Sequence, residues 1–333
     1  MTTDTTEAVG RLFDSAADTP DMSVVIPTYN RSERLLRVLG KLEEQQTNTA
    51  SGHRFSFEVI VVSDGSTDGT RGILEAFEAS SFALIPMYQE NRGPAAARNA
   101  GILEASGEVV VFLDDDVLPE PGFLSAHMNA HRSHDDLVVV GPMLTPEGTP
   151  LQPWIAWEQF QLEKQYARLD AGELLYPRQF YTGNASVRRS ALVEVGLFNT
   201  SLLRSEDIDM GLRLETAGQT FSFVAGARAF HYAQRTFESW SNVAYEYGKN
   251  DVEFSEDRQR DGLADISGYF AERSLPQRML VTWLRPGTAR HALGVRVLSA
   301  LARVCGGLRL RTPTRLLLSA VYALHYYLSL IHI

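Results

Sequence analysis

Three short runs of consecutive apolar residues constrain the fold of this chain more than any other feature of its sequence. They are Val24-Val25-Ile26, Val59-Ile60-Val61-Val62 and Val109-Val110-Val111-Phe112. A strand with one solvated face alternates apolar and polar residues, whereas a strand covered on both faces is apolar at every position. The runs therefore predict strands inside a parallel sheet that carries helices on both faces.

The elements around these runs alternate between strand and helix. Strands are predicted over Met22–Pro27, Phe57–Val62, Phe82–Tyr88, Glu108–Leu113 and Leu137–Val140. Helices are predicted over Arg31–Gln46, Thr67–Ala79 and Pro94–Ala105, and a further helical stretch over residues 206–217. Pro94 suits a helix start, where its missing N–H costs little. This alternation is typical of a doubly wound, mostly parallel α/β sheet.

Polar residues gather where three of the predicted strands end. Thr28-Tyr29-Asn30 follows the first strand, Ser63-Asp64-Gly65-Ser66 the second, and Asp114-Asp115-Asp116 the fourth. Open α/β sheets bind their ligands in the crevice outside the carboxyl ends of the strands. The three clusters together indicate one ligand site at this edge.

The triple carboxylate Asp114-Asp115-Asp116 calls for positive charge nearby. Three adjacent acids at the end of an apolar strand are unfavourable without a cation or positively charged partners. A hard divalent ion, Mg²⁺ or Mn²⁺, held by these oxygens and by substrate phosphates would meet that need. The alternative is a solvated acidic turn. The preceding strand and Pro119 favour the metal.

Five stretches, taken in order, resemble family 2 glycosyltransferases of the GT-A fold. They are Ser23–Arg31 (SVVIPTYNR), Val61–Gly69 (VVSDGSTDG), Asn91–Gly101 (NRGPAAARNAG), Phe112–Val117 (FLDDDV), and Gly183–Arg189 (GNASVRR) with Glu206–Arg213 (EDIDMGLR). The resemblance covers about residues 21–232. It implies transfer of a sugar from a nucleotide-diphosphate donor, a UDP-sugar in preference, to an acceptor hydroxyl with inversion at the sugar.

The resemblance also implies roles on the donor side. Donor-binding residues would be Pro27, Thr28, Tyr29, Asn30, Asp64, Asp68, Gly93, Arg98, Asp114, Asp115, Gly183 and Asn184. Tyr29 would offer a flat face to the base, and Asp64 would accept a base N–H. Asp68 would help hold the loop, and Arg98 would approach the nucleotide or its phosphates. Asp64 and Asp68 also suit an Asx turn leading into a helix, and both roles can hold together. Arg98 would otherwise be a surface arginine on an amphipathic helix.

Metal and base residues follow from the same resemblance. Asp116, with Asp114, would hold the metal. His231, which follows the strand-like stretch Phe221–Phe230, would complete its ligands, the alternative being a structural histidine. Inverting transfer needs a carboxylate that takes the acceptor's proton, and Asp207, with Glu206 as substitute, matches that role. The alternative is that Ser205 caps the helix and the acids merely favour its dipole.

One departure from the family pattern lies beside the predicted base. The family often has an aromatic or glycine-rich run before its acidic pair, whereas this chain has Leu202-Leu203-Arg204-Ser205. This departure leaves the acceptor and the choice between Glu206 and Asp207 open. Trp154 and Trp157 suit a hydrophobic core better than an acceptor platform.

Charge divides the chain unequally. The net charge is −10, yet residues 273–333 carry nine arginines and no acid, which leaves about −19 on residues 1–272. An acidic body of this size argues against nucleic-acid binding. The single cysteine, Cys305, fits a reducing compartment, and residues 1–20 lack an apolar segment and read as a loose tail. We therefore expect a cytoplasmic catalytic domain over residues 21–235, with a nucleotide-sugar half at 21–119 and an acceptor half at 120–235.

The remaining residues, 236–333, read as a basic, mainly helical extension. Leu316–Ile333 has no charged side chain, but as a helix it would span about 27 Å, short of a membrane crossing. Two options remain, a helix docked on the catalytic domain with its arginines paired to acids, or a segment lying on the inner membrane surface. The second option would favour a lipid-linked acceptor over a sugar or other small molecule.

Two other functions compete with the glycosyltransferase. A sugar-nucleotidyltransferase also has a doubly wound nucleotide domain, but it usually begins with a glycine-rich loop where this chain has Pro27-Thr28-Tyr29-Asn30. A non-catalytic binder of nucleotide sugars would not need Asp114, Asp116 and Asp207.

Overall fold

The computed structural model describes residues 19–202, 204–258, 274–284 and 287–329, without the side chains of residues 252–258. They form two compact units. The first, called here the sheet unit, contains the described residues up to Gly148 and those of Glu163–Tyr232. The second, the helical unit, contains Thr149–Leu162 and the described residues from Ala233 onward. Most of the tail expected at residues 1–20 lies outside the described residues.

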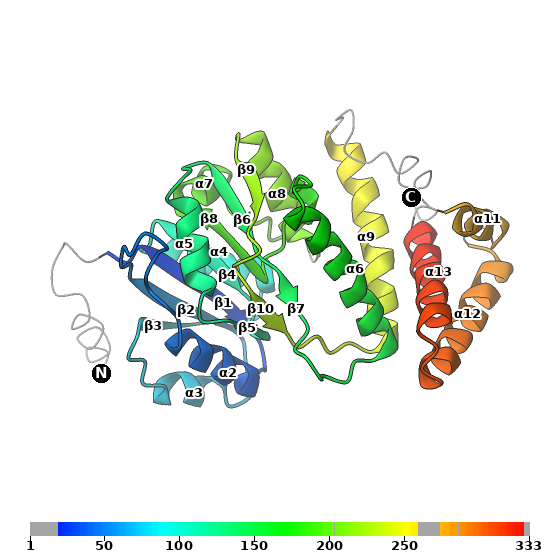
Figure 1. The fold of residues 1–333 in the computed structure, drawn as a ribbon, viewed down its shortest axis with the longest axis horizontal. Helices are drawn as coiled ribbons and strands as arrows, with labels where there is room; N and C mark the ends of the chain where they lie inside the picture. The colour runs from blue at the N-terminus through cyan, green and yellow to red at the C-terminus, as the bar shows by residue number, and fades with distance from the viewer. Residues whose placement is uncertain (1–18, 203, 259–273, 285–286, 330–333) are drawn as a thin grey trace. The chain divides into compact units, whose positions relative to one another are not determined.

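A seven-stranded sheet forms the centre of the sheet unit (Figure 1). Its strands are β1 (Met22–Thr28), β2 (Phe57–Asp64), β3 (Ala83–Gln89), β4 (Val109–Leu113), β6 (Leu137–Val140), β8 (Asn184–Arg188) and β9 (Thr220–Phe223), in the order β3-β2-β1-β4-β8-β6-β9. Strands β3, β2, β1 and β4 are parallel to one another, and β8 runs antiparallel to both β4 and β6. The doubly wound, mostly parallel sheet predicted from the sequence is confirmed.

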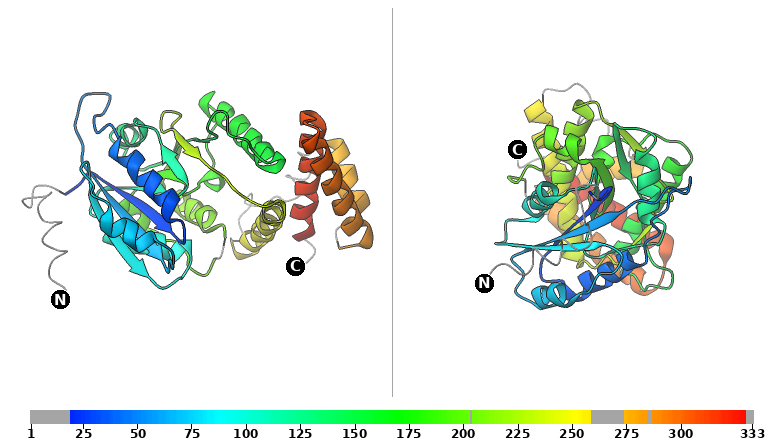
Figure 2. Two further views of the ribbon diagram at one scale, coloured as in Figure 1. Left: turned by 90° about the horizontal axis from the view of Figure 1, so that it is seen from below. Right: turned by 90° about the vertical axis from the view of Figure 1, so that its left-hand side faces the viewer.

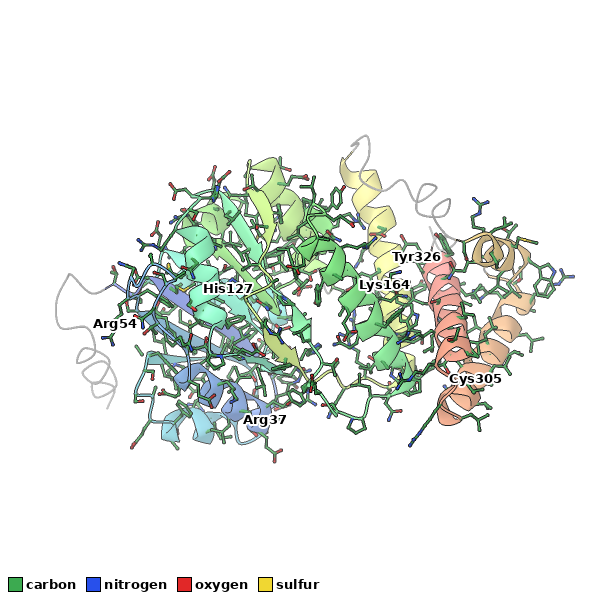
Figure 3. The ribbon with its side chains drawn as sticks, in the orientation of Figure 1. Arg37, Arg54, His127, Lys164, Cys305 and Tyr326 are labelled. Carbon is green, nitrogen blue, oxygen red and sulfur yellow. The ribbon has the colours of Figure 1, made fainter. Side chains whose placement is uncertain are left out.

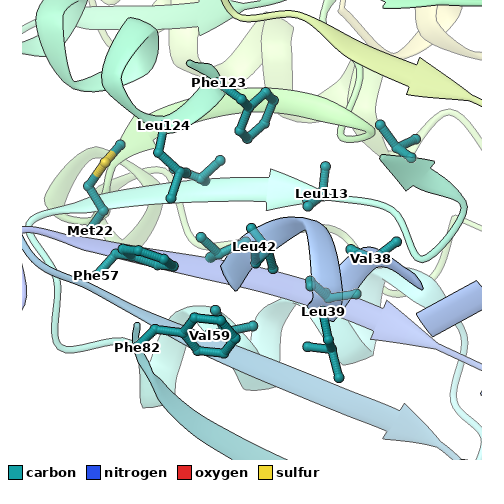
Figure 4. Close-up of a cluster of buried hydrophobic side chains, with 14 of the residues drawn as sticks. Met22, Val38, Leu39, Leu42, Phe57, Val59, Phe82, Leu113, Phe123 and Leu124 are labelled. Carbon is teal, nitrogen blue, oxygen red and sulfur yellow. The ribbon is translucent and has the colours of Figure 1, made fainter. Parts of the chain in front are cut away.

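Helices cover both faces of this sheet, as the apolar strands require. One face carries α2 (Ser32–Glu43), α3 (Thr70–Ala76) and α5 (Phe123–His131), and the other carries α4 (Pro94–Glu104), α7 (Arg189–Glu194) and α8 (Glu206–Thr216). Figure 4 shows the first face, where Leu39 and Leu42 of α2 meet Val59 of β2. Neighbouring residues of one strand point to opposite faces, so Val24 and Val25 belong to different cores.

A small second sheet joins two distant parts of the sheet unit. It consists of β5 (Val117–Pro119), β10 (Ala229–His231) and β7 (Met143–Leu144), with β10 in the middle. The sequence suggested one strand over Phe221–Phe230, and this is wrong, since the chain turns between β9 and β10 and changes sheet. The register pairs His231 with Val117, directly after Asp116. The second sheet therefore carries His231 to the acidic triplet.

Strand β8 was not predicted, because one of its faces is polar. Asn184 and Ser186 are fully buried and bind two histidines of α5. His127 Nδ1 lies 2.8 Å and His131 Nε2 lies 2.8 Å from Ser186 Oγ, and His127 Nε2 lies 3.0 Å from Asn184 Oδ1. Figure 3 labels His127. These hydrogen bonds offset much of the cost of burying the polar side chains, and His131 Nδ1 is the one ring nitrogen of the pair without a partner.

This histidine pair predicts a loss of stability in acid. Burial lowers the pKa of His127 to about 4 and that of His131 to about 3, from an ordinary 6.5. The unfolded chain takes up protons below pH 6.5, while the folded chain does not until about pH 4, so stability falls across that interval. For His127 alone, about 2 kcal/mol of unfolding free energy should be lost between pH 7 and pH 5.

Urea unfolding at the two pH values measures this loss. We expect a smaller difference in His127→Asn, which removes the titrating ring, and an unchanged difference in the control His53→Asn, whose ring is exposed. An equal pH dependence in both variants would contradict the assignment, whatever the absolute stability of His127→Asn.

The helical unit is built from α9 (Phe237–Arg258), α11 (Leu275–Leu284), α12 (Ala289–Gly307) and α13 (Arg311–Ser329), together with the first part of α6 (Pro153–Asp170). Helix α13 packs against α9 and α12, and Figure 2 shows α12 and α13 side by side. Trp157 and Trp240 pack edge to face in its core, with ring centroids 5.4 Å apart. Trp157 therefore fills a core, as its sequence context favoured. Trp154 also packs against that core, and its indole N–H donates to Arg235 O.

The uncharged C-terminal stretch docks, but on helices of its own unit. Leu318, Val321 and Leu324 of α13 are buried, and no arginine of α13 or α12 is ion-paired to an acid in the contacts shown by the described residues. Instead, Arg315 lies 3.6 Å from the centroid of the Phe160 ring and Arg303 lies 4.6 Å from that of Phe237. Within the described residues, no helix has both the length and the apolar character needed to cross a membrane.

Candidate active site

A cleft of about 390 Å³ opens at the carboxyl ends of β1, β2 and β4. This is the edge at which the sequence predicted a ligand site. Twelve residues line the cleft: Pro27, Thr28, Tyr29, Arg31, Asp64, Asn91, Gly93, Pro94, Ala97, Arg98, Asp114 and Asp115. Eight of these are residues that the family resemblance assigned to the donor. Arg31, Asn91, Pro94 and Ala97 were not assigned, although all four lie within the stretches that carry the resemblance.

Asn30 and Asp68 hold together the loops next to the cleft. Asn30 Oδ1 accepts the backbone N–H of Thr67 at 2.8 Å, and its own N–H donates to Ser66 Oγ at 3.0 Å. Asp68 accepts the backbone N–H of Ser32 at 3.1 Å and that of Thr70 at 3.0 Å. Neither side chain lines the cleft. They tie the loop after β1 to the loop after β2, which is the loop-holding role expected of Asp68.

Asp64 holds a third loop against these two. Its Oδ1 accepts from Gln89 Nε2 at 2.7 Å and from the Arg92 N–H at 2.9 Å, while Oδ2 accepts the Gly93 N–H at 2.9 Å. Gly93 has φ 88°, a conformation that glycine adopts without strain, and it directly precedes α4. The carboxylate therefore shapes the wall of the cleft, and Oδ2 keeps acceptor capacity for a ligand.

The acidic triplet is neutralised by arginines, each acid differently. Asp115 Oδ1 accepts from Arg31 at 2.7 Å and its Oδ2 accepts from Thr28 Oγ1 at 2.8 Å. Burial raises the pKa of Asp115, against the opposing effect of Arg31 and Thr28. Asp116 Oδ2 lies 3.1 Å from Arg31 and 3.2 Å from Arg34. These positive partners meet part of the need for positive charge that the sequence predicted for the triplet.

The donor atoms for a divalent cation are present at Asp116 and His231. His231 Nε2 lies 3.6 Å from Asp116 Oδ1, whereas Arg31 and Arg34 donate to Oδ2 of the same carboxylate. Asp114 Oδ2 faces Gly183, where a Cβ atom would lie 3.1 Å from that oxygen. The described residues contain no ready-made group of three metal-binding side chains. Carboxylate oxygens are ligands that Mn²⁺ and Mg²⁺ prefer, and the diphosphate oxygens of a bound donor would supply further ligands.

Arg98 links the donor side of the cleft to α8. Its guanidinium is buried on α4, 3.0 Å from Asp114 Oδ1 and 2.9 Å from Glu206 Oε1. Burial opposes the charge, but Asp114 and Glu206 outweigh burial and raise the pKa of Arg98. Its Nε is buried without a hydrogen-bond partner. Arg98 is therefore a permanent buried cation, not the surface arginine that the sequence left as its alternative.

Asp207 follows Glu206 in the first turn of α8. Burial, and then the neighbouring charge of Glu206, raise the pKa of Asp207 to about 7. Two groups oppose this rise: the Ile208 N–H, which donates to Asp207 Oδ1 at 2.8 Å, and the charge of Arg98. Ser205 has φ 60° and its side chain does not cap the helix. The capping part of the alternative is therefore wrong, while Glu206 and Asp207 do lie in the first helical turn, where acids favour the helix dipole. Asp207 therefore has a pKa near neutrality and lies within electrostatic reach of Arg98, a residue of the cleft wall.

Gly183 and Asn184 do not line the cleft. Asn184 is fully buried, and its Nδ2 donates to Pro142 O at 3.0 Å and to Ala227 O at 2.8 Å. Gly183 packs so closely that a Cβ atom would lie 2.6 Å from Met143 Sδ. Both residues hold the strands beneath Asp114, and a direct contact with the donor remains a prediction.

Comparison with known proteins agrees with this geometry. Residues 23–196 match Glycosyl transferase family 2. The chain is 30% identical over 246 residues to the uncharacterized glycosyltransferase YfnE of Bacillus subtilis, covering 60% of this chain and 61% of YfnE. It is 31% identical over 228 residues to a validoxylamine A glucosyltransferase of Streptomyces hygroscopicus, covering 60% of this chain and 52% of that enzyme.

Two solved structures share the fold. The mannosyltransferase PcManGT from Pyrobaculum calidifontis, in complex with GDP-Man and Mn²⁺, matches with a TM-score of 0.59 and 20% identity over 95% of this chain and 91% of that one. S. aureus TarS 1–349, in complex with UDP, matches with a TM-score of 0.50 and 18% identity over 94% of this chain and 91% of that one. The family match spans more than half of the chain, and the cleft contains most of the residues that its motifs assign to the donor. The protein is a member of glycosyl transferase family 2, with the GT-A fold.

Proposed function

We propose that this glycosyltransferase moves a sugar from a nucleoside diphosphate donor to an acceptor hydroxyl with inversion at the anomeric carbon. A UDP-sugar is the favoured donor. The observation that carries the proposal is the arginine bridge, since Arg98 pairs with Asp114 on the donor side and with Glu206, next to Asp207, on α8. Arg98 therefore joins the donor side, where the leaving diphosphate would bind, to the first turn of α8, where Asp207 would take the acceptor's proton.

The proposed reaction is a single displacement. The acceptor oxygen attacks the anomeric carbon, the bond from that carbon to the diphosphate oxygen breaks, and the acceptor's proton passes to Asp207. Asp207 accepts the proton when it is ionised, which its pKa of about 7 allows near neutral pH. Arg98 and Arg31 supply positive charge at the cleft wall, where the leaving diphosphate gains negative charge.

Asp116 and His231, with Asp114, are the residues that would hold Mn²⁺ or Mg²⁺. A bound ion would add positive charge opposite the diphosphate. Two observations support this metal site. Asp116 Oδ1 and His231 Nε2 lie 3.6 Å apart, and the pairing of β10 with β5 brings His231 next to the acidic triplet.

Thermal-shift titration tests the donor and the metal together. UDP, GDP and their sugars would be added with Mn²⁺ and with EDTA. A donor at about 100 times its Kd should stabilise the sheet unit by about 2.7 kcal/mol. We expect this shift for uridine nucleotides, and expect it to shrink with EDTA or in Asp116→Asn. Stabilisation by nucleoside triphosphate and sugar phosphate instead would indicate a nucleotidyltransferase.

A further inference from the structure

Helix α12 exposes a continuous apolar stripe. Leu293, Val297, Leu301, Val304 and Leu308 follow one another at helical spacing, and each is between 47% and 66% exposed. At 100° per residue they fall within roughly 80° of the helix circumference. The opposite face of α12 is the one that packs in the helical unit. The stripe is therefore a second apolar face, which the fold of the helical unit does not use.

Helix α11 repeats this arrangement. Leu275, Met279 and Trp283 lie four residues apart and are each more than 60% exposed, while Val281 and Leu284 pack inside the unit. Trp283 is the one tryptophan of the four that is exposed. Large apolar side chains exposed at helical spacing on two successive helices indicate a surface with a binding partner.

Arginines border these apolar faces. Arg296 and Arg303 lie roughly 60–80° from Leu293 around the helix, along one edge of the stripe. Residues 274–329 contain no Asp or Glu. Arg290 and Arg296 are exposed, and no carboxylate within the described parts of the chain is paired with either. An apolar stripe with arginines at its edge is typical of a helix that lies at a membrane surface.

A basic pocket lies where the stripe ends. Its volume is about 560 Å³, and Arg309, Arg311 and Arg315 line it together with apolar residues such as Leu151 and Trp157. No acid lines the pocket. A guanidinium group can bind two oxygens of one phosphate at the same time. The apolar wall of the pocket suits the carbon atoms next to a lipid phosphate.

We propose that the exposed apolar residues of α11 and α12, with the arginines beside them, dock on a bilayer that contains anionic lipid. A second copy of the chain is less suited to this surface, because residues 274–329 of the copy offer no acid to pair with the arginines. Within residues 273–333, for which the sequence leaves a membrane contact open, the proposed contact lies on α11 and α12, because much of α13 is buried. This proposal does not depend on the identity of the donor or of the base.

Vesicle sedimentation with the full chain tests the proposal. Vesicles of phosphatidylcholine alone would be compared with vesicles containing phosphatidylglycerol, at low and high salt. We expect binding that needs the anionic lipid and weakens with salt. Leu293→Glu/Leu301→Glu should weaken it at least tenfold, while the matched control Leu103→Glu/Leu174→Glu, at exposed leucines of the sheet unit, should leave it unchanged.

Two further measurements separate the apolar and basic contributions. Arg309→Gln/Arg311→Gln should reduce the dependence on anionic lipid and on salt. Trp283 should give a blue shift of tryptophan emission on binding, which Trp283→Phe removes. Absence of vesicle binding, equal binding by the stripe variant and the control, or a dimer in solution that Leu293→Glu/Leu301→Glu dissociates would overturn the proposal. Donor turnover in each variant reports that the sheet unit is folded.

Discussion

Asp207→Asn should abolish sugar transfer while leaving donor binding intact. Removal of a general base typically costs about 10²–10⁴-fold in rate, and the amide cannot take the acceptor's proton. Asp207 does not line the donor cleft, so the affinity for the nucleotide should change little. Transfer would be measured as release of nucleoside diphosphate, and binding by the thermal shift. The control is Glu215→Gln, an exposed acid on the same helix.

The pH dependence of the same variant gives an independent check. In the unmodified enzyme the rate should rise with pH through about 7, the pKa of Asp207, because only the carboxylate is active. A pKa above the ordinary 3.8 also means that ionised Asp207 destabilises the fold as pH rises from 3.8 to 7. Asp207→Asn should therefore be more stable at pH 8, on the order of 1 kcal/mol given its partial exposure. If Asp207→Asn retained sugar transfer, Asp207 would not be the general base, and Glu206 or another group would have that role.

Arg98→Met should remove both stability and activity. The guanidinium is buried between Asp114 and Glu206, and its loss leaves two carboxylates without their cation. Breaking a buried pair by removing one partner costs about 3–5 kcal/mol. Urea unfolding measures this cost, and release of nucleoside diphosphate measures the loss of transfer.

Arg71→Met is the matched control for this prediction. Arg71 also pairs with an acid, Glu75 at 3.7 Å, but both side chains are largely exposed. Its loss should cost no more than about 1 kcal/mol. Arg98→Lys keeps the charge but cannot span both acids with one planar group, so it should be intermediate. A cost for Arg98→Met as small as that for Arg71→Met would show that the bridge does not organise the site.

Local pattern was sufficient to predict the parallel half of the fold. The apolar runs at Val24, Val59 and Val109 required strands covered on both faces, and polar clusters after them required a ligand edge. The structure confirms the strands, and most residues assigned to the donor line a cleft at that edge. These features depend on residues that are neighbours in sequence, which is why the sequence alone was enough for them.

The features that the sequence did not predict depend on pairings between residues far apart in the chain. Strand β8 was missed because its polar face is satisfied by His127 and His131 of α5, more than fifty residues away. The stretch from Phe221 to Phe230 reads as one strand, yet its two ends pair with β6 and with β5.

The sequence by itself determined the fold class, the acidic triplet at the end of β4 and the basic, acid-free C-terminal region. Only the tertiary structure decided that Arg98 joins Asp114 to Glu206, that His231 reaches Asp116, and that α12, not α13, exposes its apolar face. The physical reason is that hydropathy and spacing report which side chains avoid water. The charge or surface that each one meets is set by chain segments far away in sequence.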